Sequence, residues 1–214
     1  KEKAMTVEII AEVAQGYEGD PKLAELLALG AVRSGADAVK FQLVIADELA
    51  VPTYEYYGLF KSLEMEISVW EQVVELIRRE HRKVYFDIYG DLSMELALQL
   101  RASGVKISTT DFYNKPLIKK AIATFNKVFI SIGGVPAEEL DELVQSLGED
   151  THVSLMYGFQ AEPTPTEENN LLRLSEFRKL YPHISLGFMD HSLGTSEEAI
   201  YLPLMAVSLG ISYI

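Results

Sequence analysis

Residues 7–42 read VEIIAEVAQGYEGDPKLAELLALGAVRSGADAVKFQ, and this stretch contains the unit from which the fold can be predicted. An apolar, β-branched run begins it, a second such run opens at Ala38, and the residues between them have helical periodicity. Asp20 followed by Pro21 predicts the start of the helix, because aspartate caps helices and proline suits the first helical position. Gly35 predicts its end. A strand, a helix and a second strand in this order predict a parallel β-α-β unit.

The same alternation continues to the end of the chain. Asp91 is the expected cap of one later helix, and Thr195 with Glu198 has capping-box spacing for another. Further strand candidates open near Val84, Val105, Val128, Val153, Ile184 and Ile211.

Eight strands alternating with helices predict an α/β fold, either an open doubly wound sheet or a closed barrel. No glycine-rich dinucleotide loop follows the first strand, which favours a (β/α)8 TIM barrel. The eighth strand runs into Ile214. We therefore expect one barrel domain over residues 1–214, truncated at strand eight and lacking the eighth helix, with further residues expected before Lys1 or after Ile214.

Composition narrows the class of partner. The chain has 214 residues, 48% of them hydrophobic, which is enough for one domain with a full core. A net charge of -13 argues against nucleic acid and anionic membranes, but it leaves room for a small anionic substrate in a locally positive pocket. The chain has no cysteine and no long apolar run, so we expect a cytoplasmic protein without disulfides or membrane spans.

Polar side chains recur at the expected carboxyl ends of the strands, where (β/α)8 barrels carry their active sites. They are Glu12, Lys40, Gln42, Lys106, Thr109, Asp111, Ser131, Gln160, Asp190 and His191.

Two lysines interrupt otherwise apolar strands. Lys40 and Lys106 are expected to be buried, and a buried lysine is costly unless it meets an anion. This pattern indicates a phosphate or carboxylate ligand. The alternative is that each lysine pairs with a nearby carboxylate of the chain, such as Glu12 or Asp111.

Two turns after strands carry further chemistry. Ser131-Ile132-Gly133-Gly134 can present backbone N–H groups to an oxyanion, although a plain tight turn explains it equally well. Asp190-His191 lies at a strand-to-helix junction and indicates metal or proton chemistry, the alternative being an Asp-His pair that caps a turn. Only His191, of the four histidines, falls at this face, so these residues cannot build a metal site with several histidines.

Several motifs together resemble the sialic acid synthase (N-acetylneuraminate synthase) family, in the family's order and over nearly the whole chain. The two most specific are Gly35-Ala36-Asp37-Ala38-Val39-Lys40-Phe41-Gln42 and Asp190-His191-Ser192-Leu193-Gly194. Weaker ones are Ile10-Ala11-Glu12-Val13, Val105-Lys106-Ile107, Asn114-Lys115-Pro116-Leu117-Ile118 and Pro163-Thr164-Pro165.

The resemblance implies a transferase that condenses phosphoenolpyruvate with an N-acetylated sugar aldehyde, giving a sialic-type acid and phosphate. It also implies a divalent metal, manganese or magnesium, and a homodimer. In such enzymes a C-terminal antifreeze-like domain often covers the site, and these 214 residues do not contain one.

The resemblance also assigns roles to residues. Glu12, Lys106 and Asp190 are the expected catalytic residues, and His191 is the expected metal ligand, with a second ligand expected beyond Ile214. Substrate binding is assigned to Lys40, Gln42, Lys106, Thr109, Asp111, Ser131, Gln160 and Glu162.

This chain departs from the family pattern after three strands. Gly16-Tyr17-Glu18-Gly19 replaces Asn-His-Asn-Gly, and Asp87-Ile88-Tyr89-Gly90-Asp91 replaces Ser-Thr-Pro-Phe-Asp. Gln160 and Glu162 replace an asparagine and a tyrosine that would touch the sugar, so we expect an acceptor other than N-acetylmannosamine.

Two other functions stay open at this point. The first is a Schiff-base aldolase in which Lys106 or Lys40 is the nucleophile. The second is a barrel that has lost catalysis and serves as a sugar-binding or scaffold subunit.

Overall fold

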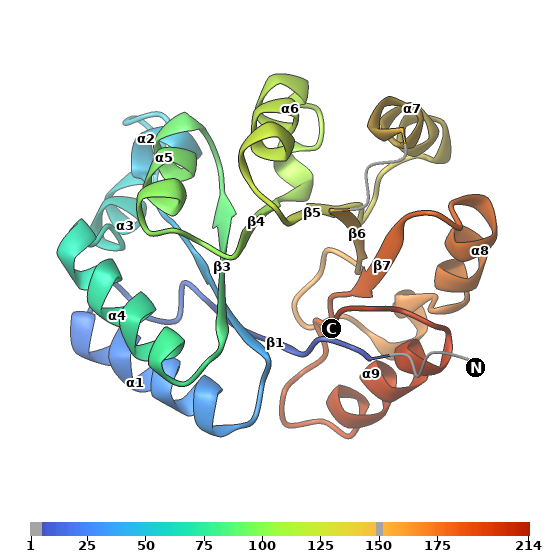
Figure 1. Cartoon of the computed structure of the whole chain (residues 1–214), viewed down its shortest axis with the longest axis horizontal. Coiled ribbons are helices and arrows are strands. Elements are labelled where there is room, and N and C mark those ends of the chain that lie inside the picture. Colours follow the sequence, from blue (N-terminus) through green and yellow to red (C-terminus); the bar gives the residue numbers. More distant parts are fainter. Residues whose placement is uncertain (1–5, 149–151) are drawn as a thin grey trace. The chain divides into compact units, whose positions relative to one another are not determined.

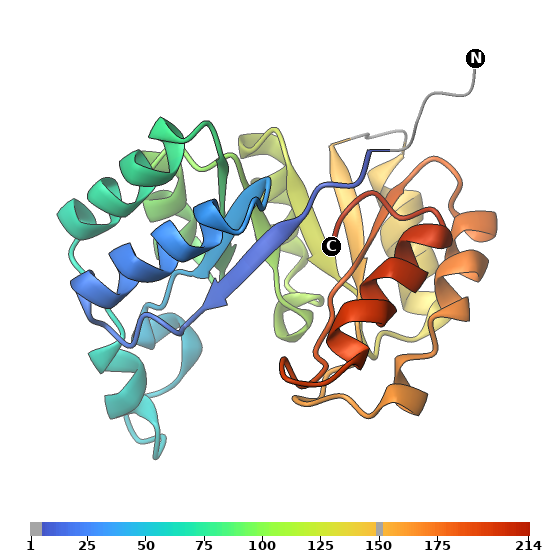
Figure 2. The same ribbon diagram turned by 90° about the horizontal axis from the view of Figure 1, so that it is seen from below.

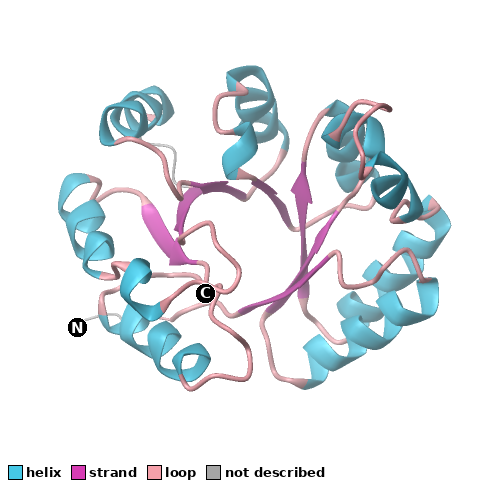
Figure 3. Ribbon diagram, turned by 180° about the vertical axis from the view of Figure 1, so that it is seen from behind, coloured by secondary structure: helices cyan, strands magenta, loops and turns pink. Residues whose placement is uncertain are grey.

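The computed structural model describes residues 6–148 and 152–214, which form two compact units. We call Ile9–Val128 the N-terminal unit, and the described residues 6–8, 129–148 and 152–214 the C-terminal unit. In each unit the helices lie outside the strands (Figures 1 and 3).

The N-terminal unit contains four parallel strands whose order in the sheet follows the chain. They are β1 (Ile10–Ala14), β2 (Ala38–Gln42), β3 (Lys83–Ile88) and β4 (Gly104–Ile107). The helices are α1 (Pro21–Arg33), α2 (Ala46–Leu49), α3 (Tyr57–Ser62), α4 (Ile67–Arg79), α5 (Asp91–Gln99) and α6 (Lys115–Thr124), with a 3₁₀ turn, η1, at Thr109–Asp111. Helices α2 and α3 follow β2 and project beyond the carboxyl ends of the strands (Figure 2).

The C-terminal unit continues the same alternation. Its strands are β5 (Val128–Ser131), which begins at the boundary, β6 (Val153–Tyr157) and β7 (Ser185–Phe188), again in chain order. Its helices are α7 (Ala137–Leu147), α8 (Leu172–Leu180) and α9 (Glu198–Ser208), with a 3₁₀ turn, η2, at Thr166–Asn169.

Six of the eight predicted strands are found at the predicted places, and the first and last differ. The first, expected from Val7, is displaced toward the C-terminus, so Glu12 is the third of the five residues of β1 rather than the strand end. The last, expected near Ile211, makes two isolated bridges through Tyr213, to Glu8 and Gly187, instead of a ladder.

The helix starts agree only in part with the predictions. Asp20 does cap α1, because its side chain accepts hydrogen bonds from the N–H groups of Lys22 and Leu23. Thr195 does not cap α9, which begins at Glu198 after Glu197. Across the described ranges 6–148 and 152–214, no helix has the length and apolar character needed to cross a membrane.

Asp91 is likewise not a cap, since it is the first helical residue of α5 and Gly90 precedes it. The first amides of α5 are capped from another element. The Glu48 carboxylate of α2 accepts from the N–H of Leu92 and from that of Ser93, at 2.5 and 3.1 Å. A Cβ on Gly90 would lie 2.4 Å from Glu48 Oε1, so glycine provides the space for this carboxylate.

Aromatic side chains fill the core of the N-terminal unit. Trp70 of α4 is 2% exposed and makes edge contacts with Tyr17, Phe41 and Phe86, at centroid distances of 5.1, 5.4 and 5.7 Å. Helix α4 also packs against α1 on the outer side of the strands (Figure 1). Two of these contacts fall on β2 and β3, from which Lys40 and Asp87, described below, arise.

Replacing Glu48 by alanine should destabilise the protein by about 1 kcal/mol, the usual cost of losing a helix cap. Asp91→Ala should have a smaller effect, because Asp91 accepts no hydrogen bond from the first amides of α5. Urea unfolding of the two variants measures the difference. A larger loss for Asp91→Ala would show that the cap is assigned wrongly.

Candidate active site

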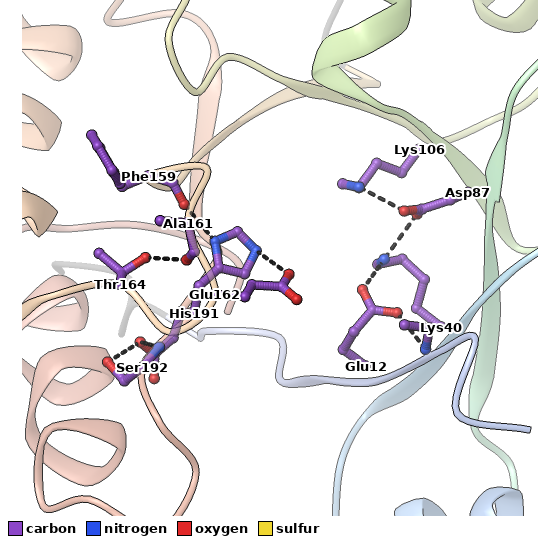
Figure 4. Close-up of polar contacts among 12 residues, drawn as sticks. Glu12, Lys40, Asp87, Lys106, Phe159, Ala161, Glu162, Thr164, His191 and Ser192 are labelled. Carbon is purple, nitrogen blue, oxygen red and sulfur yellow. Dashed lines mark hydrogen bonds and ion pairs between the residues drawn. The ribbon is translucent and has the colours of Figure 1, made fainter. Parts of the chain in front are cut away.

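Four charged side chains from four consecutive strands meet in the N-terminal unit (Figure 4). The Asp87 carboxylate of β3 lies between two lysines: Lys40 Nζ is 2.8 Å from Oδ1, and Lys106 Nζ is 2.6 Å from Oδ2. Lys40 of β2 also contacts Glu12 Oε2 of β1. Strand register explains the meeting, because Glu12 pairs with Lys40 and Asp87 pairs with Lys106 across adjacent parallel strands.

The members of this lysine cluster differ sharply in exposure. Lys40, Asp87 and Lys106 are 6%, 1% and 8% exposed, whereas 45% of the Glu12 side chain is exposed. The three buried groups carry one net positive charge, and Glu12 at the edge brings the four to neutrality. Lys40 therefore meets a chain carboxylate, the alternative left open by the sequence. Lys106 does so as well, but its partner is Asp87 and not Asp111.

The charged forms in the cluster stabilise one another. Burial disfavours the charge of Lys40, but Asp87 and then Glu12 outweigh it and raise the pKa of the ammonium. Burial likewise disfavours the charge of Asp87, yet Lys106 and Lys40 outweigh it and lower the pKa of the carboxyl. Burial, followed by the charges of Asp87 and Glu12, raises the pKa of the neighbouring Tyr89 phenol.

A β-bulge in β1 directs Glu12 toward Lys40. The register shifts between Glu12, which pairs with Lys40, and Ala14, which pairs with Phe41. Ala14 has a φ of 51°, in the left-handed region, and its N–H donates to Glu12 Oε1 at 2.8 Å. One oxygen of the carboxylate is thus held by the backbone and the other by a lysine.

Three other predicted residues lie at the strand ends of this unit. Gln42 is the last residue of β2 and is paired in register with Asp87, so it lies next to the cluster along the sheet. Thr109 and Asp111 form η1 just after β4. Burial raises the pKa of the Asp111 carboxyl, although Thr110 donates to it at 3.1 Å.

The predicted metal ligand His191 follows β7 in the C-terminal unit. Its Nδ1 lies 2.7 Å from the carbonyl oxygen of Phe159. Because a carbonyl can only accept, Nδ1 must carry the proton, which leaves the Nε2 lone pair available in the neutral ring. Glu162 Oε1 lies 3.8 Å from Nε2, and the Glu162 side chain is 80% exposed (Figure 4).

The loop after β6 holds the segment after β7 in place. The N–H of Thr164 donates to the His191 carbonyl at 2.8 Å, and the Thr164 hydroxyl donates to Ala161 at 2.6 Å. Asp190 accepts from the N–H and hydroxyl of Ser192, at 3.0 and 2.6 Å. The Asp190 carboxylate therefore closes a local turn in this structure, and a catalytic role for it stays a prediction.

Ser131 is buried at the end of β5, two residues before Gly133 of the Gly133-Gly134 turn. A Cβ on Gly133 would lie 2.2 Å from the Gly158 carbonyl oxygen, and Gly134 has a φ of 77°. Gly134 is thus explained by the turn, and Gly133 by the close approach of the loop after β6. Gln160 lies against Gly133, since its Nε2 is 2.8 Å from the position of that Cβ.

The predicted residues therefore fall into two groups, each described within its own unit. The N-terminal unit brings together Glu12, Lys40 and Lys106, and the C-terminal unit brings His191 next to Glu162. Asp87, which links the two lysines, was not among the predicted site residues. Its signal was an aspartate inside the apolar strand KVYFDI.

The donor chemistry around His191 fits a divalent cation in part. A neutral imidazole whose Nδ1–H is held by a carbonyl is the arrangement usual for metal-binding histidines, and a carboxylate lies close by. Within residues 6–148 and 152–214, however, no three His, Asp or Glu side chains lie close enough to hold an ion. His191 and Glu162, whose Nε2 and Oε1 lie 3.8 Å apart, could contribute two ligands to such an ion.

Comparison with known proteins identifies the class. The sialic acid synthetase of Leptospira borgpetersenii, a solved structure, superposes with a TM-score of 0.88 at 24% identity, over 98% of this chain and 72% of that one. This match confirms the predicted α/β barrel fold class. The NeuB family model matches residues 28–214, so the chain belongs to the NeuB family, and the predicted family is confirmed.

Two curated relatives show how far the similarity extends. An uncharacterized protein of Methanocaldococcus jannaschii is 30% identical over 209 residues, 96% of this chain and 60% of that protein. The N,N'-diacetyllegionaminic acid synthase of Legionella pneumophila is 25% identical in an alignment of 227 positions, which covers 97% of this chain and 62% of that enzyme. The chain thus spans about three fifths of the length of these relatives.

Asp87→Asn should destabilise the protein by about 3–5 kcal/mol, because it leaves two buried ammonium groups without their shared partner. Urea unfolding at neutral pH measures this loss. The matched control is Asp91→Asn, which breaks the exposed Asp91–Lys120 pair at 2.7 Å and should hardly move the midpoint. Equal shifts for the two variants would contradict a buried charge cluster.

The lowered pKa of the Asp87 carboxyl also predicts that the folded protein loses stability in acid. The Asp87 pKa is lower in the folded state, so its stabilising contribution is present above the ordinary value of about 3.9 and is lost as pH falls through the lowered value. The wild-type protein should therefore lose stability below about pH 4 more steeply than Asp87→Asn. Unfolding midpoints between neutral and acid pH test this, and parallel curves would contradict it.

Proposed function

We propose that this chain carries the catalytic barrel of an enzyme that condenses phosphoenolpyruvate with an amino-sugar aldehyde to form a sialic-type acid and phosphate. The family supports a sialic-acid-type synthase, since the relatives it matches include a diacetyllegionaminic acid synthase. A divalent ion and a homodimer belong to the same proposal. The observation that carries it is the pair of buried lysines on β2 and β4, with Asp87 of β3 between them.

The lysine cluster suits an anionic substrate. Phosphoenolpyruvate carries a carboxylate and a phosphate, and ammonium groups held in a nearly water-free site bind such charges strongly. Lys40 and Lys106 would hold these charges, with Thr109 and Ser131 as further hydroxyl donors. Gln42, Gln160 and Glu162 are the polar groups proposed to face the acceptor.

The same geometry weighs against a Schiff-base aldolase. A lysine that attacks a carbonyl needs a neutral amine, and enzymes obtain it by lowering the lysine pKa. Lys40 shows the opposite, because two carboxylates raise its pKa. Lys106 Nζ, at 2.6 Å from the fully buried Asp87 carboxylate, is also held in an ion pair.

The proposed condensation joins C3 of the enol to the aldehyde carbon. The lysines hold the anionic end of the enol while positive charge develops at C2 and the aldehyde oxygen takes up a proton. Water then adds at C2 and gives up a proton, and the C–O bond to phosphate breaks to leave a C2 ketone. Glu12, at the edge of the cluster, is placed to exchange a proton. A divalent ion bound at His191, with Glu162 nearby, would supply a Lewis acid for the aldehyde oxygen.

Phosphate release tests the proposal. Purified protein is mixed with phosphoenolpyruvate and manganese, and N-acetylated amino sugars are supplied one at a time. We expect phosphate release that requires both the sugar and the ion. If the folded protein releases no phosphate with any of the sugars, a sugar-binding or scaffold role is favoured instead.

His191→Ala should abolish acceptor-dependent phosphate release and leave the circular dichroism spectrum unchanged. The His191 side chain is 20% exposed and makes a hydrogen bond to the Phe159 carbonyl, so the substitution should lower the unfolding midpoint only modestly. His183→Ala, an exposed histidine just before β7, is the matched control and should retain full activity. Full turnover by His191→Ala would remove His191 from the site.

A further inference from the structure

The two carboxylates that contact Lys40 are not equivalent, and this difference points to a displacement step. Asp87 is 1% exposed and holds a lysine on each oxygen. Glu12 has 45% of its side chain exposed and holds only Lys40 among the lysines. Asp87 is therefore the buried partner of both lysines, while Glu12 lies at the exposed edge, from which it can move into water.

Charge in the cluster leads to the same conclusion. With Glu12 in contact, the four groups sum to zero and offer an incoming anion no net attraction. With Glu12 withdrawn, Lys40, Asp87 and Lys106 keep one positive charge in a buried setting, where it needs a counter-ion. The position that Glu12 vacates on Lys40 is open to solvent and can accept one.

The bulge in β1 provides the means for withdrawal. Glu12 Oε1 is already held by the N–H of Ala14 at 2.8 Å, so the side chain keeps a partner after it leaves Lys40. The hydrogen bond to Ala14 lies within the same strand and needs no contact with Lys40.

We propose that Glu12 is a resident counter-anion of Lys40, and that an anionic group of the substrate displaces it on binding. The idea rests on the proposed function, because it takes phosphoenolpyruvate as the anion. The displaced Glu12 carboxylate then lies beside the bound anion, free of its ion pair and able to accept a proton. Anion binding and the availability of the base are thereby linked.

Binding of phosphoenolpyruvate without any sugar tests the displacement. Calorimetric titration of wild type and Glu12→Gln is compared at one ionic strength. Because glutamine removes the internal competitor, we expect Glu12→Gln to bind about five to ten times more tightly. Lys40 keeps Asp87 in this variant, and circular dichroism verifies the fold.

Glu18→Gln is the matched control. It makes the same change in net charge at an exposed position that lies outside the cluster, so it reports long-range electrostatics alone. We expect its affinity to equal that of wild type. Equal gains for Glu12→Gln and Glu18→Gln would overturn the displacement.

The remaining outcomes separate this inference from the proposed function. If wild type binds phosphoenolpyruvate and Glu12→Gln binds it equally or more weakly, the displacement is wrong and the synthase proposal stands. If neither protein binds phosphoenolpyruvate, the displacement of Glu12 and the proposed synthase function are both wrong.

Discussion

The carboxylate of Asp87 between two buried ammonium groups is the interaction on which the candidate site depends. It joins β2, β3 and β4 through side chains, in addition to their backbone ladder. An ion pair of this kind stabilises little in net terms, because desolvation offsets most of the attraction. Its main effect is to hold Lys40 and Lys106 in place, because the Asp87 side chain between them is buried.

The sequence was informative where a pattern is local. The β-α-β alternation, the Asp20 cap and the two lysines in apolar strands could all be predicted, since each depends on neighbours in the chain. Partners from distant elements were harder to predict, although Glu12 was among the alternatives named for the buried lysines. The cap of α5 comes from Glu48, 44 residues before Leu92, and the partner of Lys106 comes from another strand. Neither relation leaves a periodic signal. Asp91 was predicted as the cap because aspartate is a common capping residue and stands at the expected start of the helix, but the structure shows that the prediction was wrong.

His191 illustrates the same limit on a smaller scale. The residue could be singled out from its place after a strand, yet its chemical state depends on the carbonyl of Phe159, 32 residues earlier. A main-chain group carries no residue identity, so any residue type at 159 would supply it. The sequence can therefore name the imidazole but not the tautomer, which requires coordinates.

The contact between α2 and α5 restricts how this protein can change during evolution. A surface insertion after a strand is ordinarily free to shorten, because loops tolerate deletion well. Here the segment that contains Glu48 also completes the first turn of α5, so trimming it would fray a helix more than forty residues away. Natural variants with a shorter connection after β2 should therefore carry a compensating acceptor near the start of that helix.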